Sequence, residues 1–328
     1  MLRIGSLTSS FGLAAVLVGC VEIIPCARFH NTDGMEPATP STADLYVGHG
    51  NPHEVGDLAV RTIDIDRCDP DAPTALRIHT PEMPGDYGVV LFQHGFMTRN
   101  AAYDDVLRHL SSHGFVVIAP QMYEPGIGPL LGNPTAAIEA ELAEQIVAWL
   151  PGNLNRITGV RARTDRLGIA GHSRGGKVAW LFALARPALF RAIAGVDPVD
   201  GTGGPLGNQP RAVQRRFEFD FPSLVIGTEL GGDCAPAGDN HVQFYEASPS
   251  PAWHIVALGQ GHGDMLDEAE AAAAAMFCSS GADHAGMRRL TAGLLVLLFR
   301  AALQGDADAY AYLTEGQGAP IAVTTEFK

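Results

Sequence analysis

Positively charged residues are scarce in this chain of 328 residues, and lysine is the scarcest of them. The sequence has 22 lysine and arginine residues against 36 aspartate and glutamate residues, so its formal net charge is −14. Only Lys177 and Lys328 are lysines, and no run of basic residues is present. Because nucleic acids are recognised through clustered positive charge, the sequence argues against nucleic acid as a partner.

Metal-binding patterns and long apolar segments are also missing. No spacing of the cysteine and histidine residues fits a zinc site, so we predict neither a metal nor another cofactor. The apolar runs over 11–18 and 294–299 are too short to cross a bilayer as a permanent helix. No internal repeat is evident, and we therefore expect a single domain behind a leader.

The first twenty residues look like an export signal. Arg3 is their only charged residue, and the apolar run over 11–18 is followed by Gly19 and Cys20. This pattern is typical of a bacterial lipoprotein signal, which is cleaved before a cysteine that then carries lipid. We expect a signal peptide over 1–19, a tether over 20–45 and a lipid anchor in the bacterial cell envelope. An ordinary secretory signal, and hence a secreted protein, is the alternative.

From residue 58 onward, strand-like apolar runs alternate with helix-like segments. The expected strands are 58–65, 75–78, 87–92, 116–119, 167–170, 192–196, 224–227 and 254–258. The expected helices are 103–113, 134–150, 177–185, 241–246 and 288–304. This alternation predicts an α/β fold, with a mostly parallel eight-stranded sheet covered by helices on both faces. We place the domain at 46–312 and a C-terminal tail at 313–328.

The segment Gly171-His172-Ser173-Arg174-Gly175 joins one of these strands to one of these helices. A serine in such a sharp turn projects its hydroxyl above the sheet, and the glycines avoid collisions as the chain reverses. This pattern is the nucleophile elbow of the α/β-hydrolase fold, and it predicts Ser173 as a nucleophile. Because the chain has 38 glycines, an ordinary glycine-rich turn is the alternative.

A nucleophilic serine needs a histidine as its base. Of the 12 histidines, only His262 follows the last expected strand within a glycine loop, over 259–264. We therefore predict His262 as the base. His241 and His254 fit a helix start and a strand interior, and His172 in the elbow fits a packed neighbour of the serine.

The base in turn needs a carboxylate, which in this fold lies between the serine and the histidine along the chain. Asp197 directly follows the expected strand 192–196 and precedes Pro198, so it is the predicted acid. Asp200 on the same loop and Asp233 after the next strand remain open as rivals. A rival that is not the acid is expected to be a solvated loop carboxylate.

The tetrahedral intermediate of acyl transfer needs backbone N–H donors for its oxyanion. In this fold one donor is the residue after the serine, here Arg174, and the other lies in the loop after the third strand. The expected strand 87–92 leads into a loop in which the Phe96 amide is the predicted second donor and Met97 the next candidate. A plain turn is the alternative for residues 94–95.

These stretches resemble the chlorophyllases, α/β hydrolases that split the phytyl ester of chlorophyll into chlorophyllide and phytol. The resemblance runs in family order from about 87 to 305, through 90–96, 112–121, 171–177, 195–201, 234–236, 261–262 and 264–267. Arg174, Lys177 and the run 264–267 make the set more specific than an elbow alone. The resemblance assigns the catalytic roles to the serine, aspartate and histidine predicted above.

Export affects the interpretation of the cysteines. With Cys20 lipidated, Cys26, Cys68, Cys234 and Cys278 remain, an even number that allows two disulfides in three pairings. Buried free thiols are the alternative. We favour Cys26–Cys68 and Cys234–Cys278, the second because the resemblance implies cysteines at similar places.

The sequence as a whole predicts a serine carboxylic ester hydrolase that acts on a small apolar ester. The resemblance implies that this ester is chlorophyll. One alternative is a lipase or polyester hydrolase that uses the same machinery on other apolar esters. The other is a non-catalytic surface-binding module that keeps the fold, against which the complete Ser, Asp and His set counts.

Overall fold

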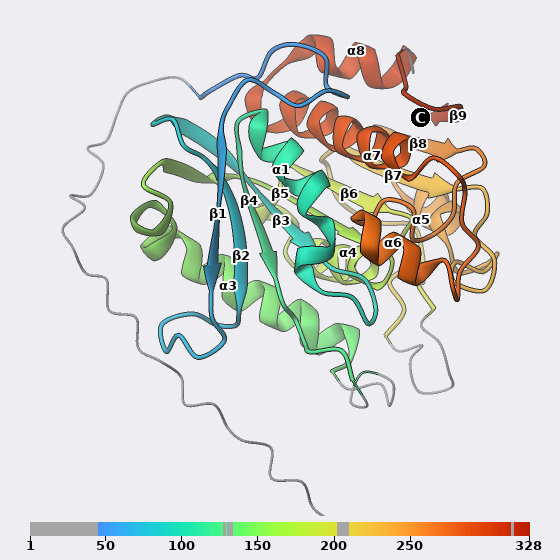
Figure 1. Cartoon of the computed structure of the whole chain (residues 1–328), viewed down its shortest axis with the longest axis horizontal. Helices are drawn as coiled ribbons and strands as arrows, with labels where there is room; N and C mark the ends of the chain where they lie inside the picture. Colours follow the sequence, from blue (N-terminus) through green and yellow to red (C-terminus); the bar gives the residue numbers. More distant parts are fainter. Residues whose placement is uncertain (1–44, 127–128, 130–133, 202–209, 316–317) are drawn as a thin grey trace, which may run out of the picture. The chain divides into compact units, whose positions relative to one another are not determined.

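A computed structural model describes residues 45–126, 129, 134–201, 210–315 and 318–328 (Figure 1). The predicted signal peptide, Cys20, Cys26 and the expected tether up to residue 44 lie outside these residues. Within the described part of the chain, no helix is long and apolar enough to cross a membrane.

The described residues form one nine-stranded sheet with the order β1-β2-β4-β3-β5-β6-β7-β8-β9. Neighbouring strands from β4 to β8 in that order run parallel, whereas β1, β2 and β9 pair antiparallel with their neighbours. The strands are β1 Val60–Ile65, β2 Leu76–Pro81, β3 Asp86–Gln93, β4 Phe115–Pro120, β5 Arg161–His172, β6 Ala192–Val196, β7 Ser223–Thr228, β8 Ala252–Ala257 and β9 Val323–Phe327. Each of the eight predicted strands overlaps one of β1 to β8.

The central strands are apolar because both of their faces are buried. Every residue of β3, β4 and β6 is buried, as expected for parallel strands that carry helices on both sides. Along β3, Val90 and Phe92 pack into one core cluster while Val89 and Leu91 pack into the other. The sheet therefore separates two cores, one on each face.

Helices cover both faces of the sheet (Figure 1). α1 (Asp104–Ser112) and α7 (His284–Phe299) pack on one face, and α3 (Ala136–Thr158), α4 (Arg174–Ala185) and α5 (His241–Ala247) pack on the other. The predicted fold class, a mostly parallel sheet covered on both faces, is thereby confirmed. The remaining helical segments are α6 Glu268–Ala274, α8 Ala307–Glu315, the 3₁₀ turns Asn100–Tyr103 and Pro187–Leu189, and a π-helical turn at Arg300–Gln304.

The C-terminal end of the chain differs from the prediction. The sequence predicted eight strands and a tail over 313–328, but within that tail β9 pairs antiparallel with β8 and becomes the ninth strand. All but the first residue of β9 are exposed. The apolar alternation that marks a half-buried strand is missing, and the strand is held as an edge by its pairing with β8, by Phe327 stacked on Trp253 and by Val323 packed against the core.

One of the two favoured disulfides joins loops near the end of the sheet. Cys234, after β7, is bonded to Cys278, after α6, with their Cα atoms 5.6 Å apart. This pairing, implied by the family resemblance, is present as expected. The other favoured pairing involves Cys26, which lies outside the described residues.

Candidate active site

Ser173 occupies the turn between β5 and α4 with a backbone that few non-glycine residues adopt. Its φ is 55° and its ψ is −124°, which is a strained conformation for an L-residue. The Ser173 amide donates to the Val196 carbonyl at 3.0 Å, and the Ser173 carbonyl accepts from the Val199 amide at 3.2 Å. A Cβ at Gly171 or Gly175 would collide with a main-chain oxygen. The turn therefore requires both glycines.

The structure brings Ser173, His262 and Asp197 into one hydrogen-bonded line. Ser173 Oγ lies 2.8 Å from His262 Nε2, and His262 Nδ1 lies 2.6 Å from Asp197 Oδ2. Because a carboxylate only accepts, His262 Nδ1 carries the proton and Nε2 is free to accept from the serine hydroxyl. Burial raises the pKa of Asp197, but the His262 hydrogen bond and charge hold that pKa below its ordinary value overall. The arrangement can take a proton from the serine.

Asp197 is fixed by the strand next to its own. It follows β6 with a φ of 40° and is fully buried. Its carboxylate accepts from the Thr228 amide at 3.1 Å and from Thr228 Oγ1 at 2.8 Å, at the end of β7. These two hydrogen bonds leave one lone-pair direction of Oδ2 facing His262. The orientation of the acid is therefore set independently of the histidine.

The two rival carboxylates lie elsewhere. Asp200 accepts from the amides of Ala212 and Val213 at 2.7 and 3.1 Å, and its carboxylate lies 3.7 Å from the ammonium of Lys177. Asp233 lies on the pocket wall after β7. Of the three candidates, Asp197 is the one that contacts His262. The expectation that Asp200 is solvated is wrong, because this residue is fully buried.

His262 lies in a loop that its neighbours hold in place. Asp264 accepts from the Gly261 and Gly281 amides, each at 2.7 Å, and from Ser280 Oγ at 2.6 Å. The buried Asp264 carboxylate thus joins the two segments of chain that flank the histidine. This is a structural role for the first aspartate of the run 264–267.

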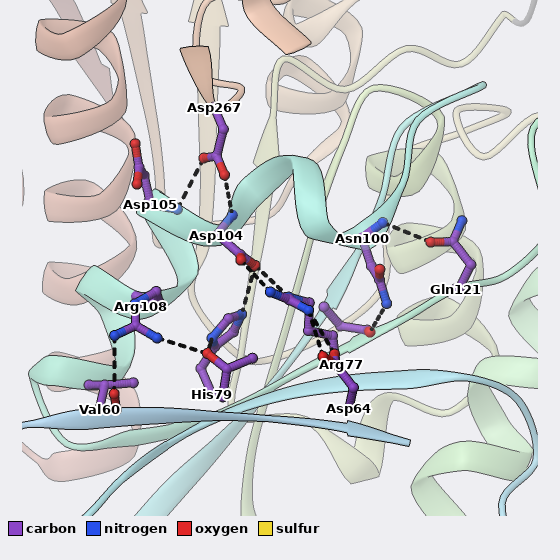
Figure 2. Close-up of polar contacts among 12 residues, drawn as sticks. Val60, Asp64, Arg77, His79, Asn100, Asp104, Asp105, Arg108, Gln121 and Asp267 are labelled. Carbon is purple, nitrogen blue, oxygen red and sulfur yellow. Dashed lines mark hydrogen bonds and ion pairs between the residues drawn. The ribbon is translucent and has the colours of Figure 1, made fainter. Parts of the chain in front are cut away.

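The second aspartate of that run attaches the histidine loop to α1 (Figure 2). The Asp267 carboxylate accepts from the Asp104 and Asp105 amides at 3.1 and 3.0 Å, which caps the helix N-terminus. Asp104 in turn receives hydrogen bonds from Arg77, and His79 Nε2 lies 3.4 Å from it. Burial raises the pKa of Asp267 to about 6. The loop that carries His262 is thereby linked through α1 to the antiparallel pair β1 and β2.

The predicted oxyanion donors flank the serine. Arg174 is the first residue of α4, so its amide has no partner within the helix. Phe96 follows Gly95, whose added Cβ would lie 3.3 Å from the Cβ of Ser173, so this loop touches the elbow. The Met97 amide, the next candidate, donates instead to the hydroxyl of Tyr123 at 3.3 Å.

The Arg174 side chain makes a buried ion pair that the sequence did not indicate. Its Nε donates to Glu139 Oε1 at 2.7 Å, and its guanidinium lies 5.7 Å from the Phe96 ring and 5.8 Å from the Tyr123 ring. Burial raises the pKa of Glu139 to about 7, although the Arg174 charge acts to lower it. Glu139 is thus buried, although a helix carboxylate such as this one is usually solvated. Its position on the apolar stripe of α3 was the available signal.

A pocket of about 980 Å³ opens above the serine. Ser173 and His262 are among its lining residues, most of which are apolar, and the charged side chains of Arg99, Asp233, Asp239 and Glu270 also line it. The wall includes the Cys234–Cys278 disulfide, and Phe277 lies on it with 82% of its surface exposed. The site thus places a hydrogen-bonded serine and histidine on the wall of a large, mostly apolar pocket. In the described ranges, no group of three or more His, Cys, Asp or Glu residues is arranged to hold a metal ion.

Comparisons with known proteins match one family model, several chlorophyllases and a cutinase. Residues 50–327 match the family model described as Chlorophyllase. Chlorophyllase-2 from Arabidopsis thaliana is 35% identical over 263 residues, which cover 73% of this chain and 81% of that protein. Chlorophyllase-1, chloroplastic, from Citrus unshiu is 37% identical over 255 residues, covering 73% and 75%. Cutinase 1 from Thermobifida cellulosilytica is 30% identical over 177 residues, covering 53% and 58%.

Proposed function

Because this chain belongs to the chlorophyllase family, we propose that it hydrolyses chlorophyll to chlorophyllide and phytol by a serine mechanism. The family resemblance and the enzyme class predicted from the sequence are confirmed, and the chain is a carboxylic ester hydrolase of the α/β-hydrolase fold. The non-catalytic module is therefore set aside. The observation that carries the proposed mechanism is the 2.8 Å contact between Ser173 Oγ and His262 Nε2, both of which line the pocket.

In the proposed reaction, Ser173 Oγ attacks the ester carbonyl while His262 Nε2 takes the hydroxyl proton. Asp197 stabilises the imidazolium that forms, and the amides of Phe96 and Arg174 donate to the oxyanion. Collapse of the intermediate breaks the ester bond, and His262 returns its proton to the leaving alcohol oxygen. A water molecule then attacks the acyl-enzyme with His262 again as base, which releases the acid and restores the serine.

The pocket supports a large apolar ester as substrate. Its volume of about 980 Å³ is at the upper end of the usual range for small-molecule sites, about 300 to 1,000 Å³. The cutinase similarity favours a second candidate, a lipase or polyester hydrolase that cleaves other apolar esters with the same residues. Both candidate functions use the same acyl-enzyme chemistry and differ in the ester that the pocket binds.

The test is to incubate the purified protein with chlorophyll and with short- and long-chain p-nitrophenyl esters. We expect chlorophyllide and phytol as products, and expect Ser173→Ala to lose activity on every substrate. Ser279→Ala, which removes an exposed serine hydroxyl nearby, is the matched control and should stay active. Cleavage of the synthetic esters without chlorophyllide would select the second candidate. Full activity in Ser173→Ala would refute the mechanism.

We further propose that the chain is exported as a lipoprotein anchored through Cys20. The support is the single positive charge, the short apolar run and the position of the cysteine among the first twenty residues. Metabolic labelling with a palmitate analogue should mark the wild type and a Cys26→Ala control. Cys20→Ala should be unlabelled, and equal labelling of all three proteins would contradict the anchor.

A further inference from the structure

His172, the residue before the nucleophile, lies between two functional loops. Its ring centre is 4.8 Å from that of His262 and 5.7 Å from that of Tyr103. Its Nε2 lies 2.9 Å from the main-chain oxygen of His262, and its Nδ1 lies 2.8 Å from the Tyr103 hydroxyl. Burial, together with the nearby His262, lowers the pKa of His172 to about 3. The ring is therefore neutral, with one N–H and one lone pair.

The chemistry of the partners determines the direction of each hydrogen bond. A carbonyl oxygen can only accept, so His172 Nε2 carries the proton and donates to His262. His172 Nδ1 is then an acceptor, and the Tyr103 hydroxyl must donate to it. Burial raises the pKa of Tyr103 to about 12, so the phenol keeps its proton. The same phenol oxygen accepts from the Gly95 amide at 2.9 Å.

These hydrogen bonds form a continuous link of fixed polarity. The link runs from the Gly95 amide through Tyr103 and His172 to the main chain of His262. One end adjoins Phe96, whose amide is the proposed oxyanion donor, and the other end carries the proposed base. A Cβ at position 95 would lie 2.9 Å from His172 Nδ1 and 3.1 Å from the Tyr103 oxygen. The link therefore depends on a glycine at its first position.

We propose that Tyr103 and His172 are positioning residues. They hold the loop after β8 that carries His262 (the base loop) and the loop after β3 that carries Phe96 (the oxyanion loop) at a fixed separation on either side of Ser173. The proposal rests on the proposed serine mechanism. Both side chains are buried, and neither belongs to the lining of the pocket described above. They act on the reaction through the two loops and do not touch the substrate.

The first test is Tyr103→Phe, which removes the hydroxyl and keeps the ring. It leaves the Gly95 amide and His172 Nδ1 without partners, so the two loops lose their connection. We expect kcat per active site to fall at least about tenfold with KM for p-nitrophenyl butyrate nearly unchanged, because small displacements of catalytic groups cost up to about a hundredfold. Active sites are counted with a phosphonate ester that labels the nucleophilic serine, so unfolded protein does not enter kcat.

Tyr87→Phe is the matched control. Tyr87 is a buried tyrosine whose hydroxyl donates to the Met83 carbonyl at 2.8 Å, outside the link. A residue with only a structural role loses folded protein but keeps kcat per active site, and this is the outcome that we expect for Tyr87→Phe. The same outcome for Tyr103→Phe would overturn the proposal.

A second variant tests the link from its other member. His172→Phe keeps a ring at this position and removes both the donor to the His262 carbonyl and the acceptor for the Tyr103 hydroxyl. Because both residues act through one link, the double variant with Tyr103→Phe should lower kcat no more than the stronger single variant. Additive losses would refute a shared link. If wild type and Ser173→Ala are equally active on the same ester, the serine mechanism itself fails, which is a distinct result.

Discussion

The two ends of the pocket are built in opposite ways. At the inner end, Ser173, Asp197 and His262 are almost fully buried, and each is held by hydrogen bonds to other strands or loops. At the rim, Phe277 lies on the pocket wall and exposes 82% of its surface. The inner end is held in one geometry by the main chain, whereas the rim can vary without disturbing it. The proposed mechanism thus places bond cleavage at the inner end and the choice of ester at the rim.

The largest effect on this comparison should come from Asp197→Asn, a substitution at the inner end of the pocket. The amide keeps the shape of the acid but removes the charge that stabilises the imidazolium, and it no longer selects the histidine tautomer. We expect turnover to fall about a thousandfold or more, with KM little changed. Steady-state kinetics at neutral pH measure both values. Asp233→Asn is the control, and its turnover should stay within about tenfold of wild type. If Asp233→Asn loses activity and Asp197→Asn keeps it, the acid is Asp233 in the loop after β7.

The next largest effect should come from the buried ion pair behind the oxyanion loop. Glu139→Ala leaves the Arg174 guanidinium buried without its carboxylate, which costs about 3 kcal/mol or more of unfolding free energy. Glu144 on the same helix pairs with Arg186, at 41% and 54% side-chain exposure. Glu144→Ala should therefore cost about 1 kcal/mol or less. Urea unfolding of the two variants compares them directly, and equal losses would contradict the assigned importance of the buried pair.

At the rim, Phe277→Ser should change substrate choice and leave the chemistry intact. A phenylalanine that packs on a long apolar chain contributes roughly 1.5 kcal/mol or more, which is about tenfold in kcat/KM. We expect this loss with p-nitrophenyl palmitate and almost none with the acetate. Met83→Ser, at an exposed methionine outside the pocket lining, should leave both substrates unaffected. A loss of equal size on the acetate would show that rim and centre are not separable.

The smallest effect concerns Asp267, where the base loop meets α1. Its pKa is raised from 3.8 to about 6 by burial, so its contribution to stability is complete below pH 3.8 and is lost as the pH rises through 6. Asn cannot ionise and keeps an acceptor for the helix. The melting temperature of Asp267→Asn relative to wild type should therefore rise between pH 4 and pH 7. The change is small because solvent screens this half-buried group.

Asp165 provides a control of opposite sign. The Arg163 hydrogen bond holds the pKa of Asp165 below its ordinary value. That stability is complete above pH 3.8 and is lost as the pH falls through the lowered pKa, so the relative melting temperature of Asp165→Asn should fall as the pH rises to 3.8 and then stay level up to pH 7. Parallel trends in the two variants would contradict the assigned pKa shifts.

What the sequence could predict follows from how local each signal is. Ser173, Asp197 and His262 each follow an apolar strand in a turn-rich segment, so chain order and local pattern were enough to select them. Their roles as catalytic residues still await the variants above. Short apolar runs along the chain likewise predicted the strands β1 to β8.

The features that were missed depend on partners far away along the chain. Glu139 is buried because Arg174, 35 positions later, folds against it. Tyr103 and His172 are 69 positions apart, and neither carries a motif that predicts their contact. β9 lacks an apolar alternation and is held at the sheet edge by its pairing with β8 and by the side-chain contacts of its first and last residues. Burial of a polar group in a tertiary contact leaves little trace in local sequence.

The scarcity of lysine has a practical consequence for attaching this enzyme to a support. Lys177 is completely buried, so Lys328 is the one lysine that amine-directed reagents can reach. Burial lowers the pKa of Lys328, which favours the reactive free amine at mild pH. Its main chain pairs with Ala252 at the start of β8, whereas His262 lies beyond the other end of that strand. Coupling through lysine would thus attach the protein at a single point. That point lies at the start of β8, whereas His262 and the pocket lie beyond its end.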